Sequence, residues 1–174
     1  RKGFVCVYEF VDKKWNKLGD TIEGEASGDG FGYYVSLSRN GKRVSIGAPE
    51  NDGDSGDDVG HIRVYEFIDN VWRQIGKDID GIVLRESDWR RELFGYRNEL
   101  SSDGKTVVGS TMAPVSVVRV FEEVNGAWRQ KGSTLEKGGT VALSGDGNLL
   151  VVDNDEDNIP PYNAVQAYVF DGVD

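Results

Sequence analysis

Apolar and polar residues alternate along most of the chain, in short runs that end at turns containing glycine. Val5 and Val7 flank Cys6, and Ile62 and Val64 recur with the same spacing. Alternation with a period of two is typical of a β-strand with one buried face. Because no window carries the sustained i, i+3, i+4, i+7 apolar pattern of an amphipathic helix, the sequence predicts an all-β fold.

One segment recurs along the chain and joins an aromatic strand to a tryptophan. Its copies are residues 3–10 with Trp15, residues 60–67 with Trp72, residues 117–122 with Trp128, and the shortened residues 165–170. The equivalent strand aromatics are separated by 57, 56 and 47 residues; they are Tyr8, Tyr65, Phe121 and Tyr168. A fixed spacing of this kind indicates a repeat architecture.

A second recurring unit lies between these segments and has Asn-Gly or Asp-Gly at its centre. Its copies are residues 35–46 around Gly41, residues 98–108 around Gly104, and residues 141–152 around Gly147. Asn-Gly and Asp-Gly between alternating apolar residues predict a β-hairpin, because glycine adopts the positive φ of such turns without a Cβ clash. Each period then holds four short antiparallel strands, the size of one β-propeller blade.

The predicted organisation is a single repeat domain over residues 1–174. The outer hairpin of a preceding blade and its connection (1–30) come first, followed by a blade (31–76), an insertion (77–93), a blade (94–132) and a blade without its last strand (138–170). This amounts to about three and a quarter blades, whereas propellers usually have four to eight. We therefore expect a partial propeller: a fragment of a longer ring, a processed subunit, or an arc completed by another copy or another chain.

A short motif in the first copy resembles the FG-GAP repeat of integrin α-type propellers. Phe-Gly at residues 31–32 is followed by Gly-Ala-Pro at 47–49; the second copy keeps Phe-Gly at 94–95 and has Gly-Ser-Thr at 109–111. The resemblance implies a β-propeller and favours an extracellular or lumenal setting. FG-GAP repeats bind calcium in the loop between the first two strands of a blade, but the corresponding turns here offer at most one carboxylate, so that site is not carried over.

Composition narrows the function by exclusion. The chain has 174 residues and a formal net charge of -10, which disfavours a surface that neutralises the phosphates of nucleic acid or an anionic membrane. No stretch approaches the roughly 18 apolar residues of a membrane span, so membrane insertion is not predicted. Cys6 is the single cysteine and cannot form an internal disulfide.

An acidic loop at residues 50–58 is the candidate metal site. Asp52, Asp54, Asp57 and Asp58 alternate with small residues and could surround a calcium ion. The alternative interpretation is a solvated acidic turn whose glycines serve the backbone geometry. Calcium is the one cofactor that the sequence suggests.

The 77–93 insertion holds the candidate binding residues. Arg85, Trp89, Arg90 and Arg91 lie together there, and tryptophan and arginine are frequent anchors of protein interfaces. Long insertions in loops cost little folding free energy, and they often contain functional residues. The alternative is that Trp89 packs back on the edge of its blade.

Little in the sequence suggests catalysis. His61 is the only histidine, so a Ser-His-Asp triad or a zinc centre is not expected. We therefore expect a non-catalytic module, not an enzyme, that binds a protein or serves as a scaffold within a larger propeller or assembly. A calcium- or carbohydrate-dependent adhesion domain is the first alternative, and a fragment of a propeller enzyme is the second.

Overall fold

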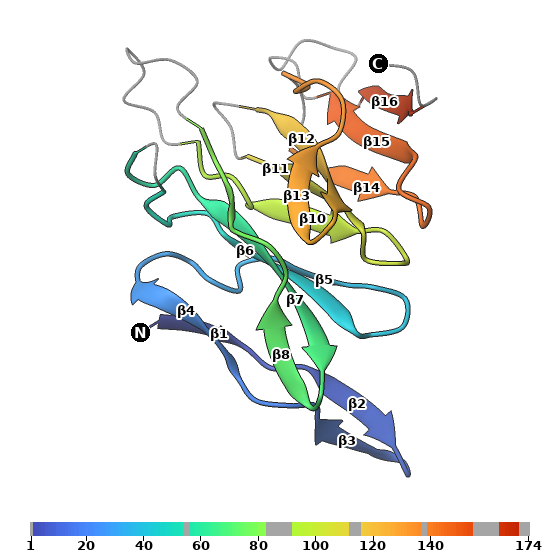
Figure 1. The fold of residues 1–174 in the computed structure, drawn as a ribbon. Coiled ribbons are helices and arrows are strands. Elements are labelled where there is room, and N and C mark those ends of the chain that lie inside the picture. Colours follow the sequence, from blue (N-terminus) through green and yellow to red (C-terminus); the bar gives the residue numbers. More distant parts are fainter. Residues whose placement is uncertain are drawn as a thin grey trace.

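The computed structural model describes residues 2–53, 56–82, 92–111, 116–136, 139–154 and 164–170, and within them it contains strands and turns but no helix (Figure 1). These residues accordingly provide no helix that is long and apolar enough to cross a membrane. The predicted all-β class is confirmed.

Two antiparallel sheets with the same strand order form the middle of the structure. The first sheet contains β5 (Val35–Leu37), β6 (Arg43–Ala48), β7 (His61–Ile68) and β8 (Val71–Gln74), and β9 (Ile79–Asp80) pairs with the start of β7. The second sheet contains β10 (Arg97–Leu100), β11 (Thr106–Ser110), β12 (Val118–Val124) and β13 (Ala127–Gln130).

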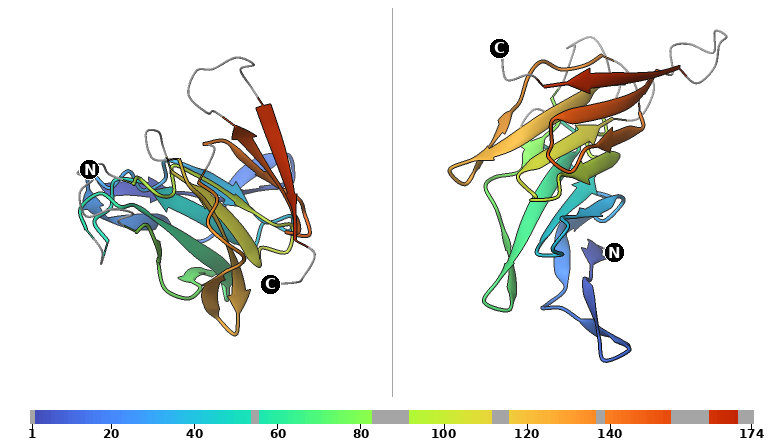
Figure 2. Two further views of the ribbon diagram at one scale, coloured as in Figure 1. Left: turned by 90° about the horizontal axis from the view of Figure 1, so that it is seen from above. Right: turned by 90° about the vertical axis from the view of Figure 1, so that its right-hand side faces the viewer.

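The remaining strands lie on either side of these two sheets. The third sheet contains β14 (Val141–Leu143), β15 (Leu149–Asn154) and β16 (Ala164–Val169). At the other end, β1 (Lys2–Val5) pairs with β4 (Ile22–Ser27), and β2 (Tyr8–Val11) pairs with β3 (Lys14–Lys17). The sheets follow one another in chain order, so the N-terminal strands and the third sheet lie at opposite ends of the array (Figures 1 and 2).

The turn between the first two strands has the same chemistry in the three larger sheets. In the second sheet, Ser101 Oγ donates to Asp103 Oδ1 at 2.7 Å, and the same oxygen accepts the Lys105 amide at 2.9 Å. The pairs Ser38 with Asn40 and Ser144 with Asp146 repeat this arrangement. The glycine that follows each Asx residue has a φ of 67° to 72°, as the sequence predicted.

The strand register corrects one equivalence that the sequence suggested. Gly109 pairs with Arg119, as Ile46 pairs with Arg63, so Gly109 is equivalent to Ile46 and not to Gly47. The counterpart of the Gly-Ala-Pro segment therefore begins at Ser110. The sequence comparison was one residue out because it matched glycines rather than counting from the hairpin turn.

Apolar residues are buried mainly between successive sheets. One cluster contains Ile62 and Val64 of the first sheet together with Leu100 and Val107 of the second. Comparable clusters join the N-terminal strands to the first sheet and the second sheet to the third. Each sheet thus depends on its neighbour to remove apolar surface from water.

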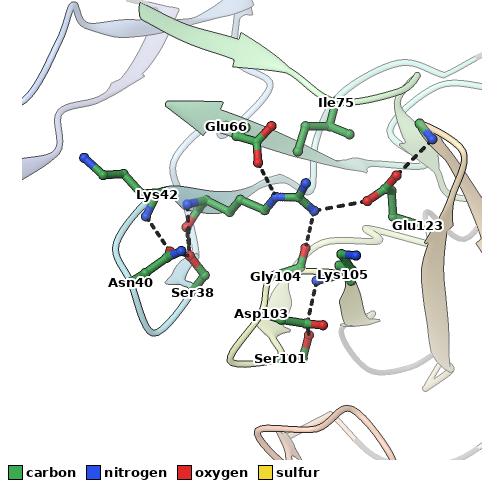
Figure 3. A network of polar contacts seen from close by, with 12 residues as sticks. Ser38, Asn40, Lys42, Glu66, Ile75, Ser101, Asp103, Gly104, Lys105 and Glu123 are labelled. Atoms are coloured by element: carbon green, nitrogen blue, oxygen red, sulfur yellow. Dashed lines mark hydrogen bonds and ion pairs between the residues drawn. The ribbon is translucent and has the colours of Figure 1, made fainter. Parts of the chain in front are cut away.

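Arg43 ties the first sheet to the second by polar contacts with three groups, whose residues Glu66, Gly104 and Glu123 are labelled in Figure 3. Its Nε donates to Glu66 Oε1 of its own sheet at 2.8 Å. Its Nη1 donates to the carbonyl oxygen of Gly104 and to Glu123 Oε2 of the next sheet, both at 3.2 Å. The side chain is only 14% exposed. Its guanidinium thus provides hydrogen bonds to three acceptors at the junction between the two sheets.

The recurring tryptophans make the same contact at successive junctions. Trp72 Nε1 donates to the carbonyl oxygen of Leu18 at 2.8 Å, and Trp128 Nε1 donates to that of Ile75 at 2.9 Å. Trp15, the equivalent residue of the first copy, is 69% exposed. The indole therefore serves as a link to the preceding repeat.

Replacement of Trp128 by phenylalanine tests this link. We expect the free energy of unfolding to fall by at least about 1 kcal/mol, because the Ile75 carbonyl loses its donor and the smaller ring packs less well. The matched variant Trp15→Phe should stay within about 0.5 kcal/mol of the wild type, since Trp15 is exposed. Equal effects of the two substitutions in denaturant titrations would contradict the assigned role.

Candidate functional site

A cleft of about 580 Å³ lies beside the N-terminal strand pair β1–β4 and the connections of the first sheet. Its lining is polar and mainly acidic and consists of Glu25, Asn51, Asp52, Gly53, Gln74, Gly76, Lys77, Asp78 and Asp80. We call it the Glu25 cleft. Three segments that are far apart in sequence contribute to it: β4, the connection after β6, and the stretch from the end of β8 to β9.

Arg63 lies at the base of these carboxylates. It is a buried residue of β7, and its Nε and Nη2 donate to the two oxygens of Asp78 at 2.8 and 2.6 Å. Nη2 also donates to Glu25 Oε1 at 2.5 Å. Burial lowers the pKa of the guanidinium, but hydrogen bonds and charge attraction from Asp78 and Glu25 outweigh this and hold the pKa above its ordinary value.

The same contacts act on Asp78. Burial raises the pKa of its carboxyl, whereas hydrogen bonds from Arg63 and from Gln74, whose Nε2 donates at 2.7 Å, lower it; the net pKa lies below the ordinary value. Asp78 is therefore held ionised at neutral pH. Glu25 receives the same guanidinium but keeps 54% of its side chain exposed at the cleft.

His61 lies behind the carboxylates and is fully buried. Its Nδ1 lies 2.9 Å from Asn51 Oδ1. The amide group of Asn51 donates to Asp29 Oδ2 at 3.1 Å and to Glu25 Oε2 at 3.3 Å, which turns its oxygen toward the imidazole. The network thus assigns the proton of neutral His61 to Nδ1.

Burial is the main cause of a lowered pKa at His61, and the charge of Arg63 lowers it further. Asp78, whose Oδ2 lies 3.8 Å from Nδ1, acts in the opposite direction but does not reverse the shift. The imidazole is therefore neutral at pH 7. Its Nε2 is buried and has no hydrogen-bond partner among the described residues.

Glu25, His61 and Asp78 could supply the ligands of a metal ion, since one ligand atom from each lies within 4.8 Å of the others. Arg63 argues against this use. Its guanidinium already bonds to both carboxylates and supplies the positive charge at that point. A metal ion would have to displace a buried arginine, so the site fits an organic ligand better than a cation.

The equivalent position of the second sheet holds a different ion pair. Arg119 Nη2 lies 2.5 Å from Glu92 Oε1, and both side chains are only 3% exposed. Burial raises the pKa of Glu92 and lowers that of Arg119. This pair is enclosed between sheets, with the guanidinium carbon 4.2 Å from the centre of the Phe94 ring, whereas the Arg63 network opens to solvent at Glu25.

The structure places part of the predicted calcium site. Asp52 lines the Glu25 cleft, and its Oδ1 accepts the amide of Asp58 at 3.0 Å, which closes its own loop. Asp57 and Asp58 follow Gly56, which pairs with Gly53. Asp54 lies outside the described residues. Calcium binding at this loop stays a prediction.

The predicted binding residues of the insertion, Arg85, Trp89, Arg90 and Arg91, lie outside the described residues. That hypothesis also stays a prediction.

Sequence reasoning missed Glu25, Arg63 and Asp78. The one available signal was a difference between repeats: the counterparts of Arg63 and Asp78 in the first copy are Cys6 and Thr21, whose side chains lie 3.6 Å apart. A charged pair at that position marks the copy that carries the cleft.

No protein-family model matches the chain, and no curated protein matches it in sequence. Solved structures do share its fold. A Bacteroides fragilis protein with the provisional name 6-phosphogluconolactonase is 18% identical, with a TM-score of 0.55 over 85% of this chain and 37% of its own. A protein of the same provisional name from Bacteroides uniformis is 15% identical, with a TM-score of 0.57 over 97% of this chain and 48% of its own. The periplasmic gluconolactonase of Pseudomonas aeruginosa is 17% identical, with a TM-score of 0.52 over 94% of this chain and 45% of its own.

These similarities establish a propeller-like β fold, and the chain spans less than half the length of these three structures. They do not single out the FG-GAP class. They also correct the expectation of a non-catalytic module that is not an enzyme, because these three structures carry the names of 6-phosphogluconolactonases or of a gluconolactonase. That expectation treated His61 as isolated, whereas folding surrounds it with carboxylates from distant segments.

The pKa of His61 can be measured directly, because it is the only histidine. We expect NMR titration to give a pKa below the reference value of about 6.5. In that case the unfolded state binds more protons than the folded state between the folded-state pKa and about pH 6.5. Stability should therefore fall as the pH falls through this window, by up to about 1.4 kcal/mol per pH unit.

The variant His61→Gln is the control for this pH dependence. It should lack the part of the acid loss that belongs to the imidazole, so the difference in unfolding free energy between wild type and variant should change only within that window. A His61 that titrates at or above pH 6.5 would show that the imidazole is not held neutral.

Proposed function

We propose that this chain is part of a propeller enzyme that hydrolyses a neutral sugar lactone at the Glu25 cleft. The observation that carries the proposal is the placement of Glu25: its carboxylate is oriented by Arg63 and Asn51, yet half of the side chain remains open to the cleft. A fixed and solvent-accessible carboxylate is suited to accept a proton from an attacking water molecule. The lactonase names of the structures that share the fold support the reaction class.

The charge of the cleft favours an uncharged substrate. Four carboxylates line it, from Glu25, Asp52, Asp78 and Asp80, against the single ammonium of Lys77. Such a surface repels a phosphorylated sugar but hydrogen-bonds readily to hydroxyl groups. It also repels the sugar acid that hydrolysis produces, which favours product release.

The reaction needs one base and one stabilising cation. Glu25 takes a proton from water as the water oxygen bonds to the lactone carbonyl carbon. Lys77, on the same cleft, stabilises the negative charge that develops on the carbonyl oxygen. When the tetrahedral intermediate collapses, the bond from the carbonyl carbon to the ring oxygen breaks, and that oxygen takes the proton back from Glu25.

A hydrolysis assay on the complete parent protein tests the proposal. Acid release from glucono-δ-lactone should exceed the spontaneous rate, and Glu25→Gln should lower kcat by at least about 100-fold, because a general base contributes roughly 10²- to 10⁴-fold. Glu23→Gln is the matched control. Glu23 is an exposed residue two positions away on β4 and lies outside the Glu25 cleft, so this variant should keep wild-type activity.

Two results would refute the proposal. One is a parent protein that does not accelerate lactone hydrolysis. The other is a folded Glu25→Gln variant with unchanged kcat. Faster hydrolysis of a phosphorylated lactone than of the neutral one would reject the assignment of an uncharged substrate.

We also propose that the sheets are blades of a larger propeller, of which the described strands form an arc of about three and a quarter blades. Trp15 supports this, because its counterparts Trp72 and Trp128 each bond to a preceding repeat. Phe4, Tyr8 and Phe10 are also exposed at this end of the array. A further repeat of the same kind would cover them, so the partner in the assembly is another blade, and membership of the FG-GAP class within propellers stays a hypothesis.

Exchange of the indole N–H protons, followed by NMR in the parent protein, tests the arc. If another blade covers Trp15, its indole proton should exchange as slowly as those of Trp72 and Trp128. In the isolated chain of 174 residues, the Trp15 proton should exchange faster than the other two. Fast exchange of the Trp15 proton in both proteins would show that no blade covers this face.

A further inference from the structure

Two neighbouring sheets present equivalent residues side by side at the start of β5 and β10. Tyr33 and Tyr34 follow Gly32, and Tyr96 and Arg97 follow Gly95. Both glycines have a positive φ, 89° and 87°, which turns the chain into the strand. Because β5 and β10 are adjacent, these four side chains form one group, the tyrosine-arginine cluster.

The backbone that carries the cluster is held firmly. The aromatic residues before the two glycines, Phe31 and Phe94, are both buried in the clusters between sheets. Asn98 Nδ2 donates to the carbonyl oxygen of Tyr34 at 3.1 Å, which fixes the start of β5 against β10. The cluster is therefore preorganised by the fold.

Two aromatic rings contact the guanidinium of Arg97, and a third ring packs against one of them. The ring centres of Tyr33 and Tyr96 lie 4.9 Å apart at an interplanar angle of 34°. The guanidinium carbon of Arg97 lies 5.3 Å from the centre of the Tyr34 ring and 5.7 Å from that of Tyr96. Interaction with the Tyr96 side chain is the main cause of a raised pKa at Tyr33.

Arg97 differs from the other enclosed arginines. Arg43, Arg63 and Arg119 each bond to at least one carboxylate. Arg97 is half-buried, and in the part of the chain that the structure describes it forms no ion pair, although acidic residues outnumber basic ones by 30 to 20. Its five N–H donors are well suited to a carboxylate from outside the chain.

We infer that the tyrosine-arginine cluster is a binding site for a sugar acid, that is, a pyranose ring that carries a carboxylate. The carboxylate pairs with Arg97, and the ring lies against Tyr33, which is 56% exposed and can offer its face. The tyrosine hydroxyls donate to and accept from the sugar hydroxyls. Glu50 is exposed, and within the described residues it forms no ion pair with Arg97.

This site is distinct from the Glu25 cleft, since none of its four residues lines that cleft. The inference goes beyond lactone hydrolysis and does not depend on it. It is tested by binding alone, so a failure of one proposal leaves the other intact.

The experiment is a titration of the 174-residue chain with glucuronate and, separately, with glucose, followed by NMR chemical shifts. Glucuronate should bind at least about tenfold more tightly than glucose, because a charge-assisted hydrogen bond to Arg97 adds to the ring contacts. Arg97→Gln should abolish this preference, and Tyr33→Ala should weaken the binding of glucuronate. Arg39→Gln is the matched control, because Arg39 is exposed and lies in the turn at the far end of β5.

Several results would overturn the inference. These are no binding of glucuronate, equal binding of glucuronate and glucose, or an undiminished preference in Arg97→Gln. A loss of binding in Arg39→Gln equal to that in Arg97→Gln would show that glucuronate responds only to overall charge.

Discussion

Every sheet of this protein is too small to bury its own faces and depends on the next sheet to do so. A strand pair or a four-stranded sheet has two faces, and the apolar clusters here are formed mainly by residues of two successive sheets. Contacts between successive repeats therefore hold each sheet in its place along the array. The indoles of Trp72 and Trp128 and the guanidinium of Arg43 provide those contacts, each bridging from one repeat to another.

The acidic composition of the chain determines the role of its buried arginine side chains. A chain with a formal net charge of -10 contains abundant carboxylates, and its enclosed arginines become the centres around which they gather. Arg63 and Arg119 occupy equivalent positions on β7 and β12, but their surroundings differ. Arg119 is enclosed with Glu92 and Phe94, so its pair fixes the junction, whereas Arg63 orients Glu25 at a surface and leaves one carboxylate accessible.

Local patterns were sufficient to predict the hairpins of the larger sheets, but not β4 and β9. The Asn-Gly and Asp-Gly turns predicted the hairpins, because the required φ is a property of one residue, and the spacing of the tryptophans indicated the repeat. The Glu25 cleft was not predictable in this way. Glu25 comes from β4, Asn51 from the connection after β6, and Asp78 from the connection before β9, and only the folded arrangement brings the carboxylates of Glu25 and Asp78 to Arg63. Neither alternation nor a turn motif records a contact between such distant segments.

Comparison of the repeats with one another is a better guide to function than any motif in the chain. A residue type that recurs in every copy, such as the strand aromatic or the tryptophan, serves packing that every copy needs. The pair of Arg63 with Asp78 occurs in one copy only, because Arg119 recurs at the position of Arg63 but Thr134 stands at that of Asp78. Arg63 with Asp78 replaces Cys6 with Thr21, and Arg97 stands at the position of Tyr34, so both candidate sites lie where one repeat departs from its neighbour. Because the repeated contacts already hold the fold together, these positions are free to take side chains selected for binding or chemistry.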